Sequence, residues 1–173
     1  MTREQLLLGE WACLGLLYDR RLHGFAIAAE LRPDTPVGRI WSVSRPLTYR
    51  SLDQLVERGL VRPVASEPGE AGPDRTVLAA TRTGRARLRT WLATPVLHVR
   101  DLRSELLLKI ALAERCGIYI DPMLHAQRER LEEQIANLST VAFDESGRVA
   151  DVVALWRREA ALAGQRFITL LRS

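Results

Sequence analysis

The sequence predicts a mainly α-helical protein that carries one small β-hairpin. Apolar residues recur at three- and four-residue spacings over most of the chain, which is the period of amphipathic helices. A segment rich in Gly and Pro, residues 67–74, separates two short runs of β-type residues and predicts the hairpin. With 173 residues, 47% of them hydrophobic and 27% charged, the chain is long enough for one or two small domains and too apolar to be disordered.

Three helices are expected before the hairpin. Residues 3–18 form a first helix with an apolar face, and residues 25–31 form a short second helix that ends before Pro33. The third helix begins after Ser44, a residue type favoured at helix N-caps, and runs to Arg58, which Gly59 follows. That glycine stands where a left-handed C-terminal cap belongs.

The hairpin and a fourth helix complete the first half. Residues 60–64 and 75–80 are the two expected strands, and the helix that opens at Thr83 ends before Pro95. A three-helix unit followed by a hairpin is the winged helix-turn-helix arrangement. We therefore expect residues 1–95 to form such a domain, with the hairpin as its wing.

Residues 96–173 are expected to form a helical domain. Residues 99–115 have a broad apolar face, a helix starts at Asp121, and the last helix covers residues 148–171. In the middle helix three leucines recur every seven residues: Leu124, Leu131 and Leu138. Such a seam packs against another helix or against a second subunit, and the sequence alone leaves both open.

The positive charge lies in the first half of the chain. Residues 1–95 hold 14 Arg and 10 Asp or Glu, a net charge of 14 − 10 = +4, whereas residues 96–173 hold 11 basic and 11 acidic residues. Arginine pairs bidentately with phosphate and with guanine edges. A high-GC genome that encodes Arg in place of Lys throughout would also enrich arginine. An excess of positive charge confined to one half of the chain nevertheless favours a polyanionic partner.

Enzymatic, metal and membrane functions are not expected. The two cysteines, Cys13 and Cys116, lie far apart in apolar surroundings, and the three histidines are equally scattered. The chain offers no nucleophile–base pair, no phosphate-cradling glycine loop and no metal or cofactor motif. It also lacks a signal-peptide pattern and a run of roughly 20 apolar residues, so we expect a cytoplasmic protein without a membrane span.

Four segments of the first half resemble the PadR family of bacterial regulators. They follow the family's order and span roughly residues 6–95: Leu14–Leu17 with Leu22–Ile27, Trp41–Ser44, Leu47–Val61 and Thr81–Arg85. The departures from the family pattern are Pro46, Thr48, Val56 and Leu78. The resemblance implies a winged helix-turn-helix that binds DNA and a C-terminal helical half that dimerises.

The third helix and the wing hold the candidate DNA-binding residues. Leu52, Leu55 and Val56 are expected to face the core, so that polar side chains point outward. Arg and Gln have the geometry to read base edges, and the resemblance gives Tyr49 a phosphate contact. Intrahelical ion pairs on a solvated face, such as Arg50 with Asp53, are the alternative. The candidates are Arg45, Thr48, Tyr49, Arg50, Gln54 and Arg75.

The resemblance also implies a small-molecule effector. Related regulators bind flat aromatic or drug-like molecules between dimer-interface helices, and Trp91, Trp156 and Phe167 are the candidate lining residues. Ordinary core packing is the alternative for each of them. The expected function is a dimeric repressor that binds a pseudo-palindromic operator in double-stranded DNA and is released by its effector. The alternative is a winged-helix dimer that binds a small molecule or a protein without recognising DNA.

Overall fold

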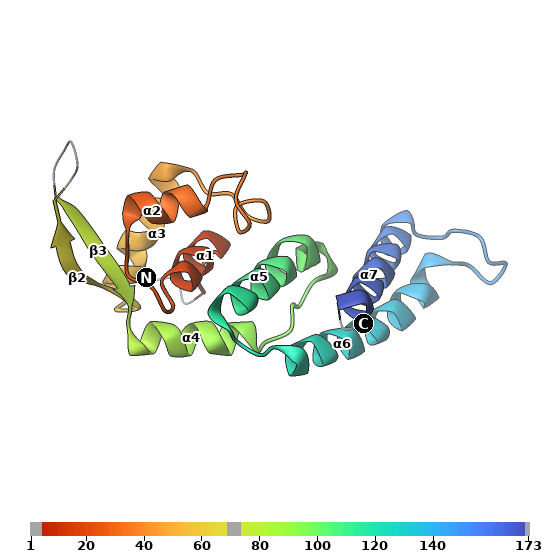
Figure 1. Cartoon of the computed structure of the whole chain (residues 1–173). Helices are drawn as coiled ribbons and strands as arrows, with labels where there is room; N and C mark the ends of the chain where they lie inside the picture. Colours follow the sequence, from red (N-terminus) through yellow and green to blue (C-terminus); the bar gives the residue numbers. More distant parts are fainter. Residues whose placement is uncertain (1–4, 69–73, 172–173) are drawn as a thin grey trace. The chain divides into compact units, whose positions relative to one another are not determined.

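A computed structural model describes residues 5–68 and 74–171 (Figure 1). The chain divides into two compact units by its internal contacts. The first unit comprises the residues up to Leu92 together with Leu107–Tyr119, and the second comprises Ala93–Leu106 together with the residues from Ile120 onward.

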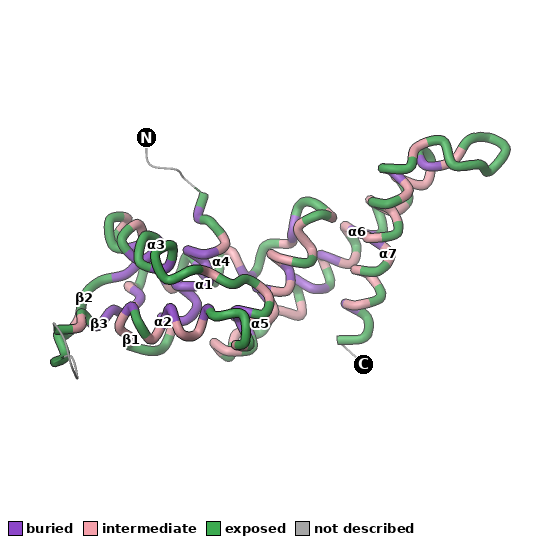
Figure 2. The backbone as a smooth tube through the Cα atoms, turned by 90° about the horizontal axis from the view of Figure 1, so that it is seen from above, coloured by how far each residue is buried: buried purple, intermediate pink, exposed green. Residues whose placement is uncertain are grey.

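The first unit has the order of elements expected for a winged helix. It consists of α1 (Leu8–Leu16), β1 (Leu22–His23), α2 (Gly24–Glu30), α3 (Arg45–Glu57), β2 (Val61–Glu67), β3 (Arg75–Ala80), α4 (Arg82–Leu92) and α5 (Leu107–Cys116). Helix α1 is buried from Gly9 to its end at Leu16 (Figure 2). It packs against α3, α4 and α5 and is the centre of this unit.

The sheet has three antiparallel strands in the order β1-β3-β2. Strands β2 and β3 form the expected hairpin, with Val61 opposite Ala80 at its base. Strand β1 was not expected, because it consists of only two residues, which pair with Leu78 and Val77 of β3. Part of the predicted turn, residues 69–73, lies outside the described residues.

The junction between α3, the wing and α4 depends on a few polar contacts. Gly59 has φ of +65°, the left-handed conformation predicted for the end of α3. The Thr81 hydroxyl donates hydrogen bonds to the carbonyls of Gly59 and Leu60 and accepts one from the amide of Gly84. The Thr81–Gly84 pair therefore caps α4 and ties it to the chain that leaves α3.

Helix α5 packs with the first unit, although the expected domain boundary at residue 95 places it in the second half. Its buried residues Leu108, Leu112 and Ala113 explain this position. The Leu112 side chain lies so close to Gly15 of α1 that a Cβ there would be 2.6 Å from Leu112 Cδ2. The compact units therefore differ from residues 1–95 and 96–173, and the dimerising role of the second half stays a prediction.

The second unit is built on two long antiparallel helices, α6 (Asp121–Ala142) and α7 (Val152–Leu171), preceded by η1 (Val99–Asp101) and η2 (Leu102–Leu106). Hydrogen bonds join Arg158 to Ser139 and Gln165 to Glu132, so the helices run in opposite directions. Leu131 is buried beside Gly164 of α7. The heptad seam of α6 thus contacts another helix of the same chain. None of the helices in the described residues is long and apolar enough to cross a bilayer.

Candidate nucleic-acid interface

Helix α3 has one buried face and one exposed face. Its buried residues are Thr48, Ser51, Leu52 and Leu55, spaced three and four apart as helical geometry requires. The exposed face includes Arg45, Pro46, Tyr49, Arg50 and Asp53. The helix starts directly after Ser44 as predicted, although the Ser44 side chain makes no capping hydrogen bond. Three of the six candidate DNA-binding residues, Arg45, Tyr49 and Arg50, therefore lie on an accessible surface.

Two sequence-based expectations for this helix were wrong. Thr48 is fully buried, and its hydroxyl donates a hydrogen bond to the Ser44 carbonyl, so it does not face the solvent with the arginines. Val56 is exposed instead of facing the core. Thr48 lies four residues before Leu52 and seven before Leu55, and this spacing places it on the buried face.

Tyr49 packs against the start of α2. A Cβ on Gly24 would lie 2.7 Å from Tyr49 Cε1, so the ring rests directly on the glycine. This contact explains why glycine follows His23 here. The His23 ring also caps α2, since its Nδ1 accepts a hydrogen bond from the amide of Ala26. The His23–Gly24 turn thereby fixes the position of the Tyr49 ring on the exposed face.

Two candidate arginines from different elements meet at an aromatic ring. The Arg45 guanidinium carbon is 5.1 Å from the centre of the Phe25 ring, and the Arg75 guanidinium carbon is 5.8 Å from it. Arg45 is also 5.9 Å from the Tyr49 ring. The sequence did not single out Phe25, although an aromatic residue in the Leu22–Ile27 motif was a usable signal.

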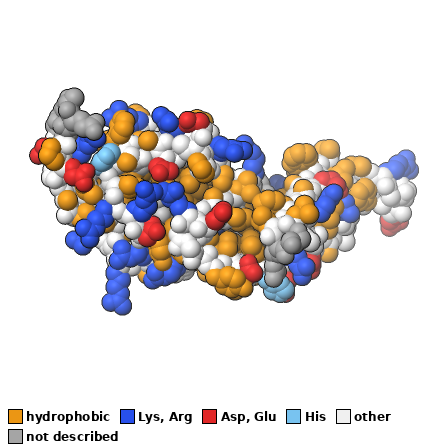
Figure 3. Space-filling view, in the orientation of Figure 1, with side chains coloured by type: hydrophobic (Ala, Val, Ile, Leu, Met, Phe, Trp, Pro, Cys, Tyr) orange, Lys and Arg blue, Asp and Glu red, His pale blue; other side chains and the backbone are white. Residues whose placement is uncertain are grey.

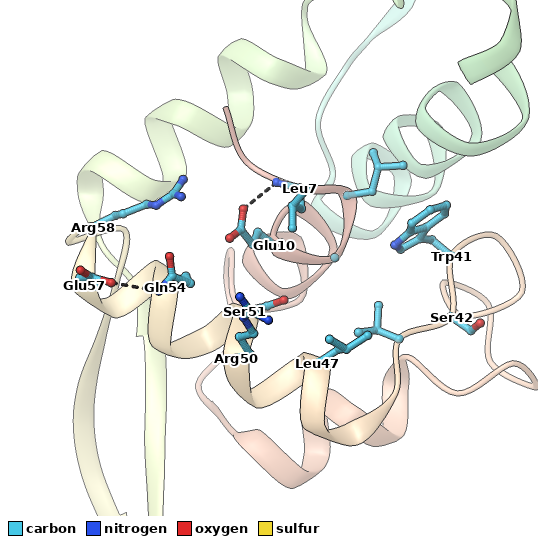
Figure 4. Close-up of a pocket in the computed structure, with 13 residues that line it drawn as sticks. Leu7, Glu10, Trp41, Ser42, Leu47, Arg50, Ser51, Gln54, Glu57 and Arg58 are labelled. Carbon is cyan, nitrogen blue, oxygen red and sulfur yellow. Dashed lines mark hydrogen bonds between the residues drawn. The ribbon is translucent and has the colours of Figure 1, made fainter. Parts of the chain in front are cut away.

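Gln54 and Arg50 line a groove between α3, the start of α1 and residues 41–43 (Figure 4). Gln54 donates a hydrogen bond to Glu57, which directs its amide along the helix. The groove has a volume of about 900 Å³. Its apolar lining includes Leu7, Trp41, Val43 and Leu47, and its polar lining includes Glu10, Ser51 and Arg58. Gln54 is half-buried, between the buried and the exposed face of α3.

The three candidate effector residues belong to two different units. Trp91 stacks on Trp11 with ring centres 4.6 Å apart, and Lys109 lies 4.8 Å from the Trp91 ring. This packing occupies Trp91 within the first unit. Trp156 and Phe167 lie on α7, where Trp156 is 72% exposed. Their role in an effector pocket stays a prediction.

Neither cysteine has the properties of a reactive group. Burial raises the pKa of the Cys13 thiol to about 12, and the Glu10 carboxylate adds to the effect. Burial likewise raises the pKa of Cys116 to about 11, assisted by Asp19. Both thiols are protonated at neutral pH. Within residues 5–68 and 74–171 there is no group of three or more His, Cys, Asp or Glu side chains able to hold a metal ion.

Arginines stand at several places on the surface of the first unit, mixed with apolar side chains (Figure 3). The helices α1 to α3, the three-stranded sheet and α4 together define a winged helix-turn-helix fold.

A scan of protein-family models finds no match to the chain, and a search of the curated proteins finds none either.

Three solved structures are similar to the chain over nearly its whole length. Bacillus subtilis PadR in complex with operator DNA is 16% identical, with 95% of this chain and 97% of that chain covered and a TM-score of 0.48. The protein smu.1604c from Streptococcus mutans UA159 is 15% identical, with 94% and 97% covered and a TM-score of 0.46. A second Bacillus subtilis PadR structure is 15% identical, with 99% and 96% covered and a TM-score of 0.44.

Proposed function

We propose that the chain is a sequence-specific DNA-binding transcriptional regulator of the PadR type, acting in the cytoplasm. The observation that carries this proposal is the exposed face of α3, where Arg45, Tyr49 and Arg50 stand together at the start of the helix. In helix-turn-helix proteins this end of the recognition helix contacts base edges. The four PadR-like sequence segments and the positive charge of residues 1–95 support the same function.

The exposed residues divide by role. Arg50 is exposed at the edge of the groove beside α3 and is the candidate for bidentate contact with guanine. Tyr49, held against Gly24, is positioned for a phosphate contact that fixes register without reading sequence. Gln54 would reach an adenine edge only after its hydrogen bond to Glu57 is exchanged.

Dimerisation through α7 is the second part of the proposal. Ala154, Ala161 and Ile168 are the buried residues of this helix, spaced by sevens. Large apolar side chains are exposed elsewhere on it and just before it: Val149, Val152, Val153, Trp156, Leu170 and Leu171. Unpaired apolar surface of this extent marks an interaction site. A twofold dimer would place two copies of α3 in successive major grooves of a pseudo-palindrome and block transcription there.

Release by a small molecule completes the proposed repressor. An effector that contacts Trp156 and Phe167 at the dimer interface would change the spacing of the two α3 helices. It releases DNA only if it binds the released state more tightly than the bound state.

Fluorescence anisotropy with labelled duplex DNA tests the function. One duplex carries the DNA upstream of the protein's own gene and the other a scrambled sequence, and each is titrated with the protein over a salt series. We expect tighter binding to the first and a steep loss of affinity with salt, because phosphate contacts release counterions. Arg50→Gln should abolish the preference between the duplexes, whereas Arg103→Gln, at an exposed position of η2 outside both α3 and α7, is the matched control and should leave it unchanged.

A second candidate function is an interaction module that keeps this fold without DNA recognition. The groove beside α3 favours it, since it combines apolar side chains with an arginine whose Nε and Nη1 are buried without a hydrogen-bond partner, Arg58. Failure of the wild-type protein to bind either duplex at low salt would favour this function over DNA binding.

A further inference from the structure

Phe25 is an exposed aromatic side chain that connects three elements of the first unit. It lies in the first turn of α2 and is 50% exposed. The guanidinium of Arg45, the first residue of α3, and that of Arg75, the first residue of β3, both lie within 6 Å of its ring centre. The exposed ring thus lies beside guanidiniums from two other elements.

Among the described residues, the two guanidiniums have no acidic partner. Within the described residues neither Arg45 nor Arg75 forms an ion pair with a carboxylate. Glu67 is the cross-strand neighbour of Arg75, but the two side chains do not form a salt bridge. The negative face of an aromatic ring attracts cations, so Phe25 holds two positive charges near one another without neutralising them. Such a pair is stabilised further by an anion.

From this geometry we infer that Phe25, Arg45 and Arg75 form a phosphate-binding cluster for the DNA backbone, with Phe25 as the positioning residue. The inference rests on the proposed function and names the part of the partner that this surface takes. The planar guanidinium matches a phosphodiester, to which it donates two parallel hydrogen bonds. A ring that limits the rotamers of both arginines lowers the entropy lost on binding.

Backbone contact, in preference to base reading, follows from where the three residues come from. In helix-turn-helix proteins the recognition helix supplies most of the contacts to base edges in the major groove, whereas this cluster joins the start of α2, the start of α3 and the wing. Contacts from several elements to phosphates fix the orientation of the protein on the duplex. Tyr49 extends the cluster, because Arg45 also lies 5.9 Å from its ring.

The test compares Phe25→Leu, which keeps apolar volume but removes the ring, with Phe25→Tyr, which keeps the ring. Affinity for the upstream duplex and for the scrambled duplex is measured by anisotropy over a salt series. We expect Phe25→Leu to weaken binding to both duplexes by the same factor, about three- to ten-fold. Each lost phosphate contact should also lower the salt slope by about 1. Phe25→Tyr should retain wild-type affinity.

A double-mutant cycle separates positioning from folding. In an Arg45→Gln/Arg75→Gln background, Phe25→Leu should cause no further loss, because the ring acts only through the two arginines. The control is Tyr119→Leu, which also replaces an aromatic by an aliphatic side chain at an exposed site of the first unit. It should change neither the affinity for DNA nor the salt slope.

Several results would overturn the inference, and each is distinguishable from failure of the proposed function. If the wild-type protein binds DNA and Phe25→Leu binds with the same affinity and salt slope, the cluster is refuted and the proposed function stands. The same holds if Phe25→Leu lowers affinity as much in the Arg45→Gln/Arg75→Gln background as in the wild type. If the wild-type protein binds neither duplex, the proposed function fails and the cluster fails with it. A loss confined to the upstream duplex would show that Phe25 contacts bases and would also refute the phosphate assignment.

Discussion

The substitution Gly84→Ala tests the packing that holds α4 to the winged-helix core. Helix propensity alone predicts that alanine stabilises this helical position by up to about 1 kcal/mol. The structure predicts the opposite, because the new Cβ would lie 2.1 Å from the Leu60 carbonyl oxygen, well inside the ordinary contact distance. That oxygen also accepts hydrogen bonds from the amide and the hydroxyl of Thr81.

The size of the effect follows from these contacts. Relieving the overlap needs a shift of more than about 1 Å, and forced overpacking typically costs about 1–3 kcal/mol. Loss of the two hydrogen bonds to Leu60 adds about 1 kcal/mol each. After the propensity gain is subtracted, we expect the free energy of unfolding to fall by about 2–4 kcal/mol. Urea denaturation followed by circular dichroism at one protein concentration measures it.

Gly9→Ala in α1 is the matched control. A Cβ there would lie 3.5 Å from Ser51 Oγ and Val43 Cγ2, an ordinary contact distance. The same substitution should therefore leave stability unchanged or raise it by up to about 1 kcal/mol. A Gly84→Ala protein as stable as the wild type would refute the close approach of α4 to Leu60.

Four further predictions concern other contacts. Thr81→Val should lower the unfolding free energy by about 1 kcal/mol in urea denaturation, because it removes the cap of α4; an unchanged value would refute the cap. Gly24→Ala should displace the Tyr49 ring and weaken duplex binding in anisotropy with less than about 1 kcal/mol lost in stability; equal affinity would contradict this. Trp156→Glu should convert a dimer to a monomer in light scattering, whereas a monomeric wild type would refute dimerisation through α7. Cys13 and Cys116 should react with dithionitrobenzoate at pH 8 only after unfolding, because the raised pKa of each thiol suppresses the thiolate; rapid labelling of the native protein would contradict this.

Local signals in the sequence identified the elements of the winged helix. The apolar spacing, the turn-rich segment and Gly59 depend on neighbouring residues only, and the structure confirms the helices, the hairpin and the left-handed glycine. Thr48 was misplaced although the information was local, since its spacing from Leu52 already put it on the buried face.

Other features depend on residues far apart in the chain and could not be predicted. Strand β1 exists only because Leu22 meets Leu78 on β3. Trp91 is packed by Trp11, a partner eighty positions earlier. The meeting of Arg45 and Arg75 at Phe25 likewise requires the fold to be complete. Each of these contacts is set by tertiary packing, for which periodicity carries no signal.

Hydroxyl-radical footprinting of the DNA upstream of the protein's own gene tests the central claim most directly. A dimer that places α3 of each copy in successive major grooves should protect two patches about 10 base pairs apart, related by the operator's pseudo-twofold axis. Arg50→Gln should remove both patches together. A single patch, or protection that is uniform along the duplex and unchanged by Arg50→Gln, would contradict the assignment of α3 as the DNA-reading element of a twofold dimer.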